Sequence, residues 1–222
     1  MKKSYEFCLC AISILLCFLL LLSGVRRREA ALAASLAPKV LRFHVLANSD
    51  SPGDQALKLQ VKDFLLTEIS RRAKEQGGAP EKADLTACIT EEKETLEQAA
   101  ESLLQSLGSH EPVRISLETC EFPTRTYGDM TFPAGTYEAV RVRIGEGKGH
   151  NFWCVLYPSL CVTDSVRAVM PEESKETLKR LLPEEDFHAL FQARRPFFAK
   201  KAGQDVPPSG VRIRFRLLEN FF

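Results

Sequence analysis

The stretch LRFHVLANSDSPGD, residues 41–54, holds the features that decide the fold. Apolar side chains alternate with polar ones in its first half, at Leu41, Phe43 and Val45. This alternation predicts a half-buried strand. Ser51 suits the N-cap of a helix, and Pro52 suits the first helical position, where its missing N–H costs no hydrogen bond. Asp54 completes a Ser-x-x-acid capping box, so we expect the strand to turn directly into a capped helix.

Strands and helices continue to mix along the rest of the chain. Apolar residues at helical spacing predict a helix that ends before Gly77, an acidic helix over 91–107, and two short helices over 171–182 and 183–192. Alternation predicts strands over 113–117, 140–144 and 211–217, and an apolar hairpin over 152–162. The order lacks a regular strand–helix–strand rhythm. It predicts an α+β fold, a single domain with a mixed, mostly antiparallel sheet and helices on one face.

Composition excludes several classes of protein. The chain has 222 residues, and its 30 Lys and Arg against 29 Asp and Glu give a net charge of +1. This balance argues against a nucleic-acid binder held by gross positive charge and against an acidic disordered tail. The four histidines, at 44, 110, 150 and 188, show no ligand-type spacing, so we expect no metal site and no cofactor.

The N-terminal segment predicts export. Two lysines precede an apolar run from Phe7 to Leu22, which is long for a signal peptide and short for a comfortable membrane span. Small-x-small cleavage patterns end at Ala33 and Ala37, but three arginines at 26–28 stand before them and disfavour translocation. We expect residues 1–37 to be a signal peptide or membrane anchor with a linker, and residues 38–222 an extracytoplasmic domain. Cleavage and retention both stay open.

Four long motifs occur in order between Leu41 and Asp164. They are FHVLANSDS at 43–51, followed by Asp54, Gln55 and Lys58; FPT at 122–124 with Tyr127 and Gly128; FPAG at 132–135 with Tyr137 and Ala139; and GEGKGHNFWCV at 145–155, followed by Pro158, Leu160 and Cys161. Through these motifs the chain resembles the stage II sporulation protein R family of endospore-forming bacteria. It departs from the family pattern at Phe152, Tyr157 and Ser159, where we expect Trp, Phe and Pro.

The resemblance implies a function in intercellular signalling. A member of this family is made in the forespore and exported into the space between the two septal membranes. There it activates a membrane-embedded aspartic protease, which matures the pro-form of sigma factor E in the mother cell. The resemblance therefore implies a non-catalytic, secreted or membrane-anchored signalling protein with that protease as its partner.

An enzyme is the alternative. His150 and Cys154 could pair as base and nucleophile, and the polar stretch from Asn48 to Asp54 could hold a hydrolytic site. A core or disulfide-bonded cysteine explains Cys154 as well, and a turn with a helix cap explains much of the polar stretch. We therefore favour non-enzymatic binding, with a secreted hydrolase as the second hypothesis.

The candidate partner contacts fall into three groups. Capping alone does not require Asn48, Ser49 and Asp50 together, so these residues and Asp54 are candidates. Trp153 is either a core residue or an interface anchor. The third group comprises the basic residues that strand parity places opposite the apolar face: Arg42, His44, Arg114, Arg141, Arg143, Arg212, Arg214 and Arg216.

The basic face has two interpretations. It could be a solvated surface whose arginine stems cover the sheet, with Glu118 as a nearby partner. Alternatively, Arg141, Arg143, Arg212 and Arg214 dock onto anionic lipid headgroups or an acidic surface of the protease.

Cysteine placement predicts one disulfide. Four cysteines follow the N-terminal segment, and they allow three full pairings. Cys154 and Cys161 flank the predicted hairpin turn, so we expect them to be bonded, with two reduced thiols as the alternative. Cys88 and Cys120 are then either free or paired.

Overall fold

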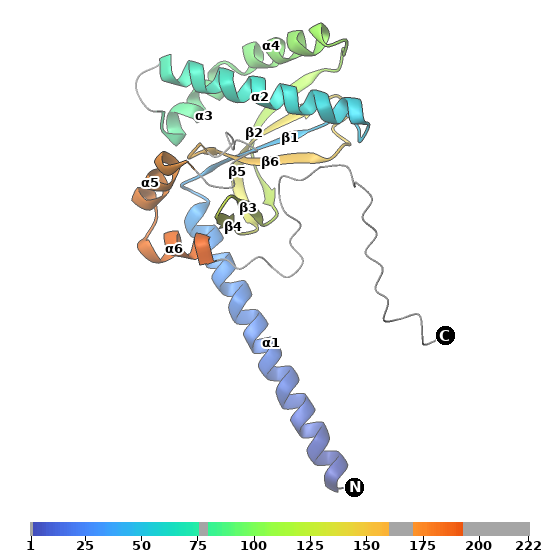
Figure 1. The fold of residues 1–222 in the computed structure, drawn as a ribbon, viewed down its shortest axis with the longest axis vertical. Coiled ribbons are helices and arrows are strands. Elements are labelled where there is room, and N and C mark those ends of the chain that lie inside the picture. Colours follow the sequence, from blue (N-terminus) through green and yellow to red (C-terminus); the bar gives the residue numbers. More distant parts are fainter. Residues whose placement is uncertain (1, 76–79, 160–170, 193–222) are drawn as a thin grey trace, which may run out of the picture.

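A four-stranded sheet stands at the centre of the computed structural model of the protein, which describes residues 2–75, 80–159 and 171–192 (Figure 1). The helices are α1 (Lys2–Leu36), α2 (Pro52–Glu75), α3 (Lys82–Glu91), α4 (Lys93–Ser106), α5 (Glu172–Leu181) and α6 (Glu184–Gln192). The strands are β1 (Leu41–Leu46), β2 (Val113–Phe122), β3 (Arg125–Tyr127), β4 (Met130–Phe132), β5 (Gly135–Ile144) and β6 (Asn151–Tyr157).

The sheet has the order β2-β5-β1-β6. β5 runs antiparallel to β2 and parallel to β1, and β6 runs antiparallel to β1. The predicted α+β class with a mixed, mostly antiparallel sheet is therefore confirmed. The predicted strand over 211–217 lies outside the described residues.

Helices α2, α3 and α4 cover one face of the sheet and form the first core (Figure 1). Strand parity predicts the buried sheet residues of this core correctly at Leu41, Phe43, Val45, Val113, Ile115, Val140, Val142 and Ile144. It is wrong at Leu117, which is 37% exposed near the outer edge of the sheet. The first turn of α2 is capped as expected, since the Asp54 N–H donates to Ser51 Oγ at 3.1 Å.

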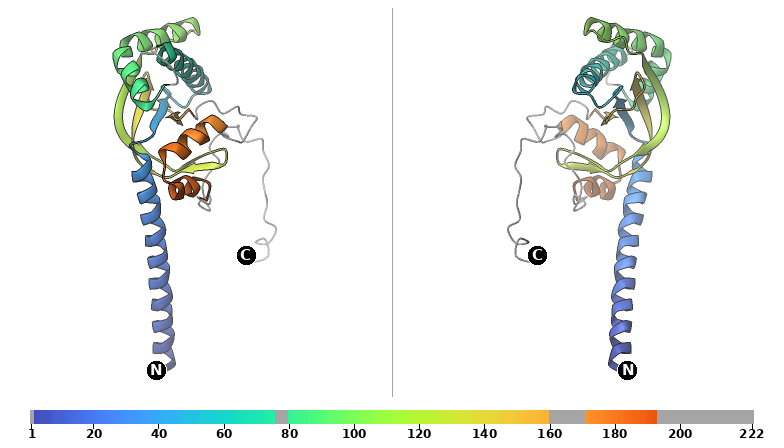
Figure 2. Two further views of the ribbon diagram at one scale, coloured as in Figure 1. Left: turned by 90° about the vertical axis from the view of Figure 1, so that its left-hand side faces the viewer. Right: turned by 90° about the vertical axis from the view of Figure 1, so that its right-hand side faces the viewer.

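The opposite face of the sheet is also covered. The hairpin β3–β4, the end of α1, and helices α5 and α6 pack there and form a second core (Figure 2). Its buried members are Leu32, Ala33, Leu36, Val40, Phe122, Tyr127, Met130, Phe132, Tyr137, Ala139, Val155, Leu178, Leu182 and Leu190. The sequence pattern predicts the two short helices beginning at Pro171 and Pro183, but it does not show that they close a second layer.

Helix α1 is continuous from the apolar run into the second core. It contains a stretch, Leu9–Leu36, that is long and apolar enough to cross a membrane, and Figure 2 shows it leaving the domain as a straight rod. Leu36 is fully buried, and Ser35 Oγ donates to Asp186 of α6 at 2.5 Å. Ala33 packs so close to β5 that a Cβ on Gly135 would lie 2.8 Å from its Cβ. The residues expected to form a linker therefore belong to the folded domain.

Arg42 and His44 are not on an exposed basic face, and that part of the prediction is wrong. Both are buried beneath the second layer, with Arg42 fully inaccessible to solvent. The Arg42 guanidinium lies in an aromatic cage, with its carbon 4.4 Å from the ring centroid of Phe122, 5.1 Å from Tyr137, 5.5 Å from Phe132 and 5.8 Å from Tyr127. Cation–π attraction to four rings offsets part of the cost of burying the charge.

Candidate functional site

Two loops meet where β1 ends and β6 begins. We call residues 47–51 the strand-end loop and residues 145–150 the glycine loop. The Lys148 N–H donates to Asn48 O at 3.1 Å, and the Gly149 N–H donates to Ala47 O at 2.9 Å. The Asn48 side chain adds a third bond, because its Oδ1 accepts the Glu146 N–H at 3.0 Å. The two longest motifs of the sequence thus form one structure.

Glycine is required in the glycine loop for two reasons. Gly145 and Gly147 have φ angles of +55° and +65°, in the left-handed region that disfavours other residues. Gly149 is required for close approach instead, since a Cβ there would lie 2.2 Å from the carbonyl oxygen of Ser49. A strand follows this loop rather than a helix N-terminus, so the loop lacks the setting of a nucleotide-binding motif.

Asp54 holds the strand-end loop against α2. Its Oδ2 accepts Ser49 Oγ at 2.5 Å and Asn48 Nδ2 at 3.2 Å. The expected capping box is thus only half present, because the carboxylate binds these two side chains while the N–H of Ser51 donates to Ser49 Oγ. This network explains why the loop needs Asn48 and Ser49 as well as the cap.

Asp50 joins the tips of the two loops. Its Oδ1 accepts the backbone N–H of His150 at 2.6 Å and also contacts the Nδ1 of the same residue. These hydrogen bonds from His150 hold the pKa of the Asp50 carboxyl below its ordinary value. Below them the buried Lys58 donates to His150 O at 3.0 Å and to Gln55 Oε1 at 2.5 Å. In the sequence Lys58 is part of a family motif but not a candidate contact, because lysine side chains are seldom buried.

The structure separates His150 from Cys154. The His150 side chain is 77% exposed at the loop tip, whereas Cys154 is buried in the first core and is disulfide-bonded. A bonded sulfur is not a thiol nucleophile, so this pair does not form a catalytic dyad. Cys161 lies outside the described residues, and its pairing with Cys154 stays a prediction. Cys88 and Cys120 are free.

Trp153 is half-buried on the second face of the sheet. Its ring stacks on that of His44 at a centroid distance of 5.0 Å and meets the edge of Phe122 at 4.8 Å. Part of the indole is therefore core, and the rest remains open to solvent.

The remaining candidate arginines are dispersed. Arg141 pairs with Glu118 at 3.1 Å, and Arg143 is exposed beside the glycine loop. Arg114 pairs with Glu101 of α4 at 2.9 Å. Arg212, Arg214 and Arg216 lie outside the described residues.

Three potential metal ligands meet although one of them lies far from the other two in the sequence. His44 of β1 lies near Glu118 and Cys120 of β2, with their ligand atoms all within 4.8 Å of one another. Burial lowers the pKa of His44 to about 4, which leaves its imidazole neutral at neutral pH. Spacing could not reveal this cluster, because β5 separates the two strands in the sheet.

Comparison with known proteins identifies the family. The family model described as stage II sporulation protein R matches residues 37–167, which is more than half of the chain. The curated stage II sporulation protein R of Bacillus subtilis (strain 168) is 32% identical over 231 aligned residues, covering 99% of this chain and 97% of that protein. The chain belongs to the stage II sporulation protein R family. No solved structure matches.

Both loops of the site lie inside the segment that matches the family model. The apolar half of α1 lies before that segment but within the full-length match to the Bacillus protein. The resemblance drawn from the motifs is therefore confirmed. The mixed α+β domain of this chain, preceded by an apolar helix, is thus the fold of a member of the family.

Proposed function

We propose that the protein is a forespore-made signalling protein that activates the membrane-embedded aspartic protease maturing pro-sigma E in the mother cell. Activation is by direct, non-catalytic contact in the space between the septal membranes. Family membership over nearly the full chain is the observation that carries this proposal.

The packing of α1 supports a membrane-anchored form of the signal. Leu32 follows Arg28 by four residues, about 6 Å along a helix axis, and is already buried in the second core. A retained α1 therefore leaves almost no linker between the bilayer and the domain. The β3–β4 hairpin and α6 lie on the side of the apolar helix, and the α2–α4 layer lies on the far side (Figure 1).

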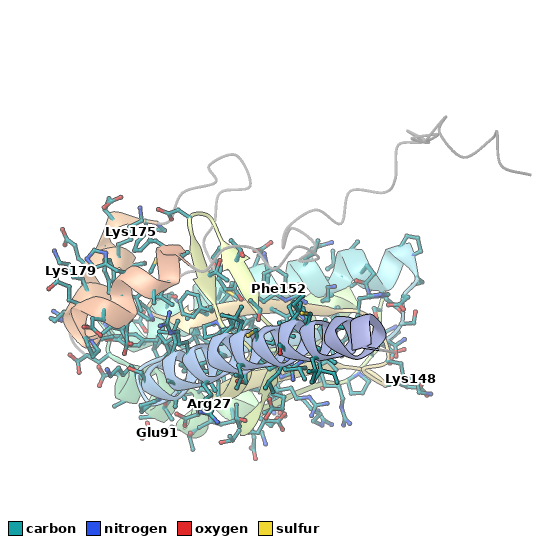
Figure 3. The ribbon with its side chains drawn as sticks, turned by 90° about the horizontal axis from the view of Figure 1, so that it is seen from below. Arg27, Glu91, Lys148, Phe152, Lys175 and Lys179 are labelled. Atoms are coloured by element: carbon teal, nitrogen blue, oxygen red, sulfur yellow. The ribbon has the colours of Figure 1, made fainter. Side chains whose placement is uncertain are left out.

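The interlocked loops are the contact surface that we propose for the protease. Asn48, Ser49 and Asp54 are engaged inside the loops and set their shape, while Asp50 and His150 are exposed at the tip. Figure 3 shows Lys148 of the glycine loop at the opposite end of the domain from Lys175 and Lys179 of α5. Arg143, exposed beside these loops, adds positive charge to the same surface.

Co-reconstitution tests this proposal. The full chain is incorporated into liposomes with the membrane protease and its pro-sigma substrate, and processing is followed on gels. We expect processing only when all three are present. Cleavage by this chain in the absence of the protease, or failure to stimulate the protease, would contradict the proposal.

Export is a separate requirement that sporulating cells can test. Replacing the apolar run 7–22 with a polar sequence should abolish processing of pro-sigma E while leaving the domain folded. A cytoplasmic variant with full activity would show that export is not needed.

A secreted hydrolase remains the second candidate, because Asp50 orients the exposed imidazole of His150 as a carboxylate orients a general base. Over residues 2–75, 80–159 and 171–192, however, the structure contains no hydroxyl or thiol hydrogen-bonded to His150. Substrate cleavage that His150→Ala abolishes, with no protease added, would favour this candidate.

A further inference from the structure

The second face of the sheet contains a cluster with the composition of a transition-metal site, formed by His44, Glu118 and Cys120. We propose that this His–Glu–Cys cluster binds a divalent metal ion of the zinc class through His44 Nε2, Cys120 Sγ and a carboxylate oxygen of Glu118. The three ligand atoms lie within 4.8 Å of one another.

The separation of the nitrogen and sulfur ligands fits a tetrahedral ion. His44 Nε2 and Cys120 Sγ are 3.8 Å apart. With Zn–N of about 2.0 Å and Zn–S of about 2.3 Å, a tetrahedral angle places these two ligands about 3.5 Å apart. A small inward movement of Glu118, whose side chain is half-buried, completes a three-ligand set with a fourth position left for water.

The imidazole is held in place and lacks a strong hydrogen bond. Trp153 stacks on the His44 ring at an interplanar angle of 11°, and Phe122 meets it edge-on at a centroid distance of 5.4 Å. Among the described residues, His44 Nδ1 has no hydrogen-bond partner, and Nε2 has only the weak contact with the Cys120 sulfur. A metal ion at Nε2 would replace this weak contact with a coordinate bond, while Nδ1 would carry the ring proton.

The strands and a neighbouring arginine orient the other ligands. Glu118 and Cys120 stand two residues apart on β2, so both project from the same face. Arg141 donates to Glu118 Oε1 at 3.1 Å, so it stands beside this carboxylate as an outer-shell partner of a metal ligand does.

The charges and the ligand types select the metal. On binding, the Cys120 thiol gives its proton to solvent, and the resulting thiolate and the Glu118 carboxylate together neutralise a divalent ion. This neutralisation is needed because Arg42 and Arg141 stand close by. One sulfur, one nitrogen and one oxygen favour zinc over the hard ions calcium and magnesium, which take oxygen ligands. The bound ion would join β1 to β2 across β5.

Cobalt spectroscopy on the full chain in detergent micelles tests the site, since tetrahedral Co²⁺ with a thiolate ligand absorbs strongly. After removal of metal with a chelator, we expect one equivalent of Co²⁺ to give a thiolate-to-cobalt band that Zn²⁺ abolishes. Cys120→Ser should remove the band, and Cys88→Ser, at the buried free thiol of α3, should leave it unchanged. Absence of the band, or its persistence in Cys120→Ser, would overturn the proposal.

A second variant covers the case in which Cys120→Ser does not fold. Glu118→Gln changes only a half-buried side chain and should weaken Zn²⁺ affinity roughly tenfold or more, the scale seen when the groups around a metal are altered. The affinity is measured by competition with a chromophoric chelator. An affinity equal to that of the unaltered chain would exclude Glu118 as a ligand and contradict the three-ligand site.

Discussion

Replacing Leu36 with alanine tests whether the end of α1 belongs to the folded domain. Leu36 is fully buried in the second core, in the last turn of a helix whose other half is exposed and apolar. If the domain uses this turn as one wall of its core, the substitution should destabilise the domain although it lies at the end of the export segment.

The size of the effect follows from burial. Truncating a fully buried leucine to alanine costs about 2–5 kcal/mol, because both transfer free energy and packing are lost. For a chain of this length each kcal/mol lowers the unfolding midpoint by about 2–4 °C. We therefore expect Leu36→Ala to lower the midpoint by about 4–20 °C.

Thermal unfolding of the full chain in micelles provides the assay. Trp153 is the only tryptophan and packs against the second core, so its fluorescence reports the unfolding of this region. Leu21→Ala, in the same helix at a position 70% exposed, is the matched control and should leave the midpoint unchanged. Equal midpoints for the two variants would refute the assignment of the α1 end to the core.

Three further outcomes are expected. Gly149→Ala should destabilise the fold by about 1–3 kcal/mol in denaturant titrations, because two hydrogen bonds between the loops are lost. The control Gly53→Ala, whose nearest neighbouring atom is 4.0 Å away, should be neutral or stabilising. Equal effects of the two substitutions would argue against the close approach of Gly149 to Ser49 O. Arg42→Ala should lower the free energy of unfolding, measured by thermal denaturation, by about 2–5 kcal/mol. Arg42→Met should lower it far less, because an apolar side chain of similar volume replaces the buried charge. Equal losses in the two variants would mean that the charge itself stabilises the fold. The carboxyl carbon of Asp50 should titrate by NMR below the ordinary pKa, and His150→Ala should raise that pKa. Since the folded-state pKa is lowered, this contact stabilises the fold above the ordinary pKa and is lost as the pH falls through the folded-state value; an unchanged titration in the variant would exclude the contact in solution.

The first core could be predicted from the sequence because local patterns determine it. Alternation at Leu41, Phe43 and Val45 gave the burial of β1, and the cap at Ser51 gave the start of α2. Alternation and helix capping depend only on residues close together in the sequence. They can therefore be recognised without knowing which helix or strand packs against the segment.

The second core could not be predicted, because its signals are non-local. The alternation of β1 places Arg42 on the side of the strand that is expected to be exposed. Only the aromatic rings from residues 122–137 that surround it show that it is buried. That segment contains many turn residues, and local patterns do not show that its aromatic side chains form a packed layer. In the same way Leu32 and Leu36 belong to an export segment by composition and to the domain by packing.

The candidate site was partly visible for the same reason. The sequence singles out Asn48, Ser49 and Asp50 as candidate contacts and the glycine pattern as a family motif, but no local pattern links the two. The hydrogen bonds that join them span about a hundred residues of chain, as from His150 to Asp50. No spacing rule covers such a separation, so the sequence could not show that one loop sets the shape of the other.

The second core connects the anchor with the proposed metal site. Phe122 lies 4.4 Å from the Arg42 guanidinium carbon and 5.4 Å from the His44 ring centroid, so one side chain touches both the aromatic cage and the His–Glu–Cys cluster. Leu36 belongs to the same core. Because close-packed interiors transmit strain, we expect a change at the end of α1 to disturb the packing of Phe122 and His44. It follows that a chain cleaved after Ala37, which loses Leu36, should bind metal more weakly than the intact chain.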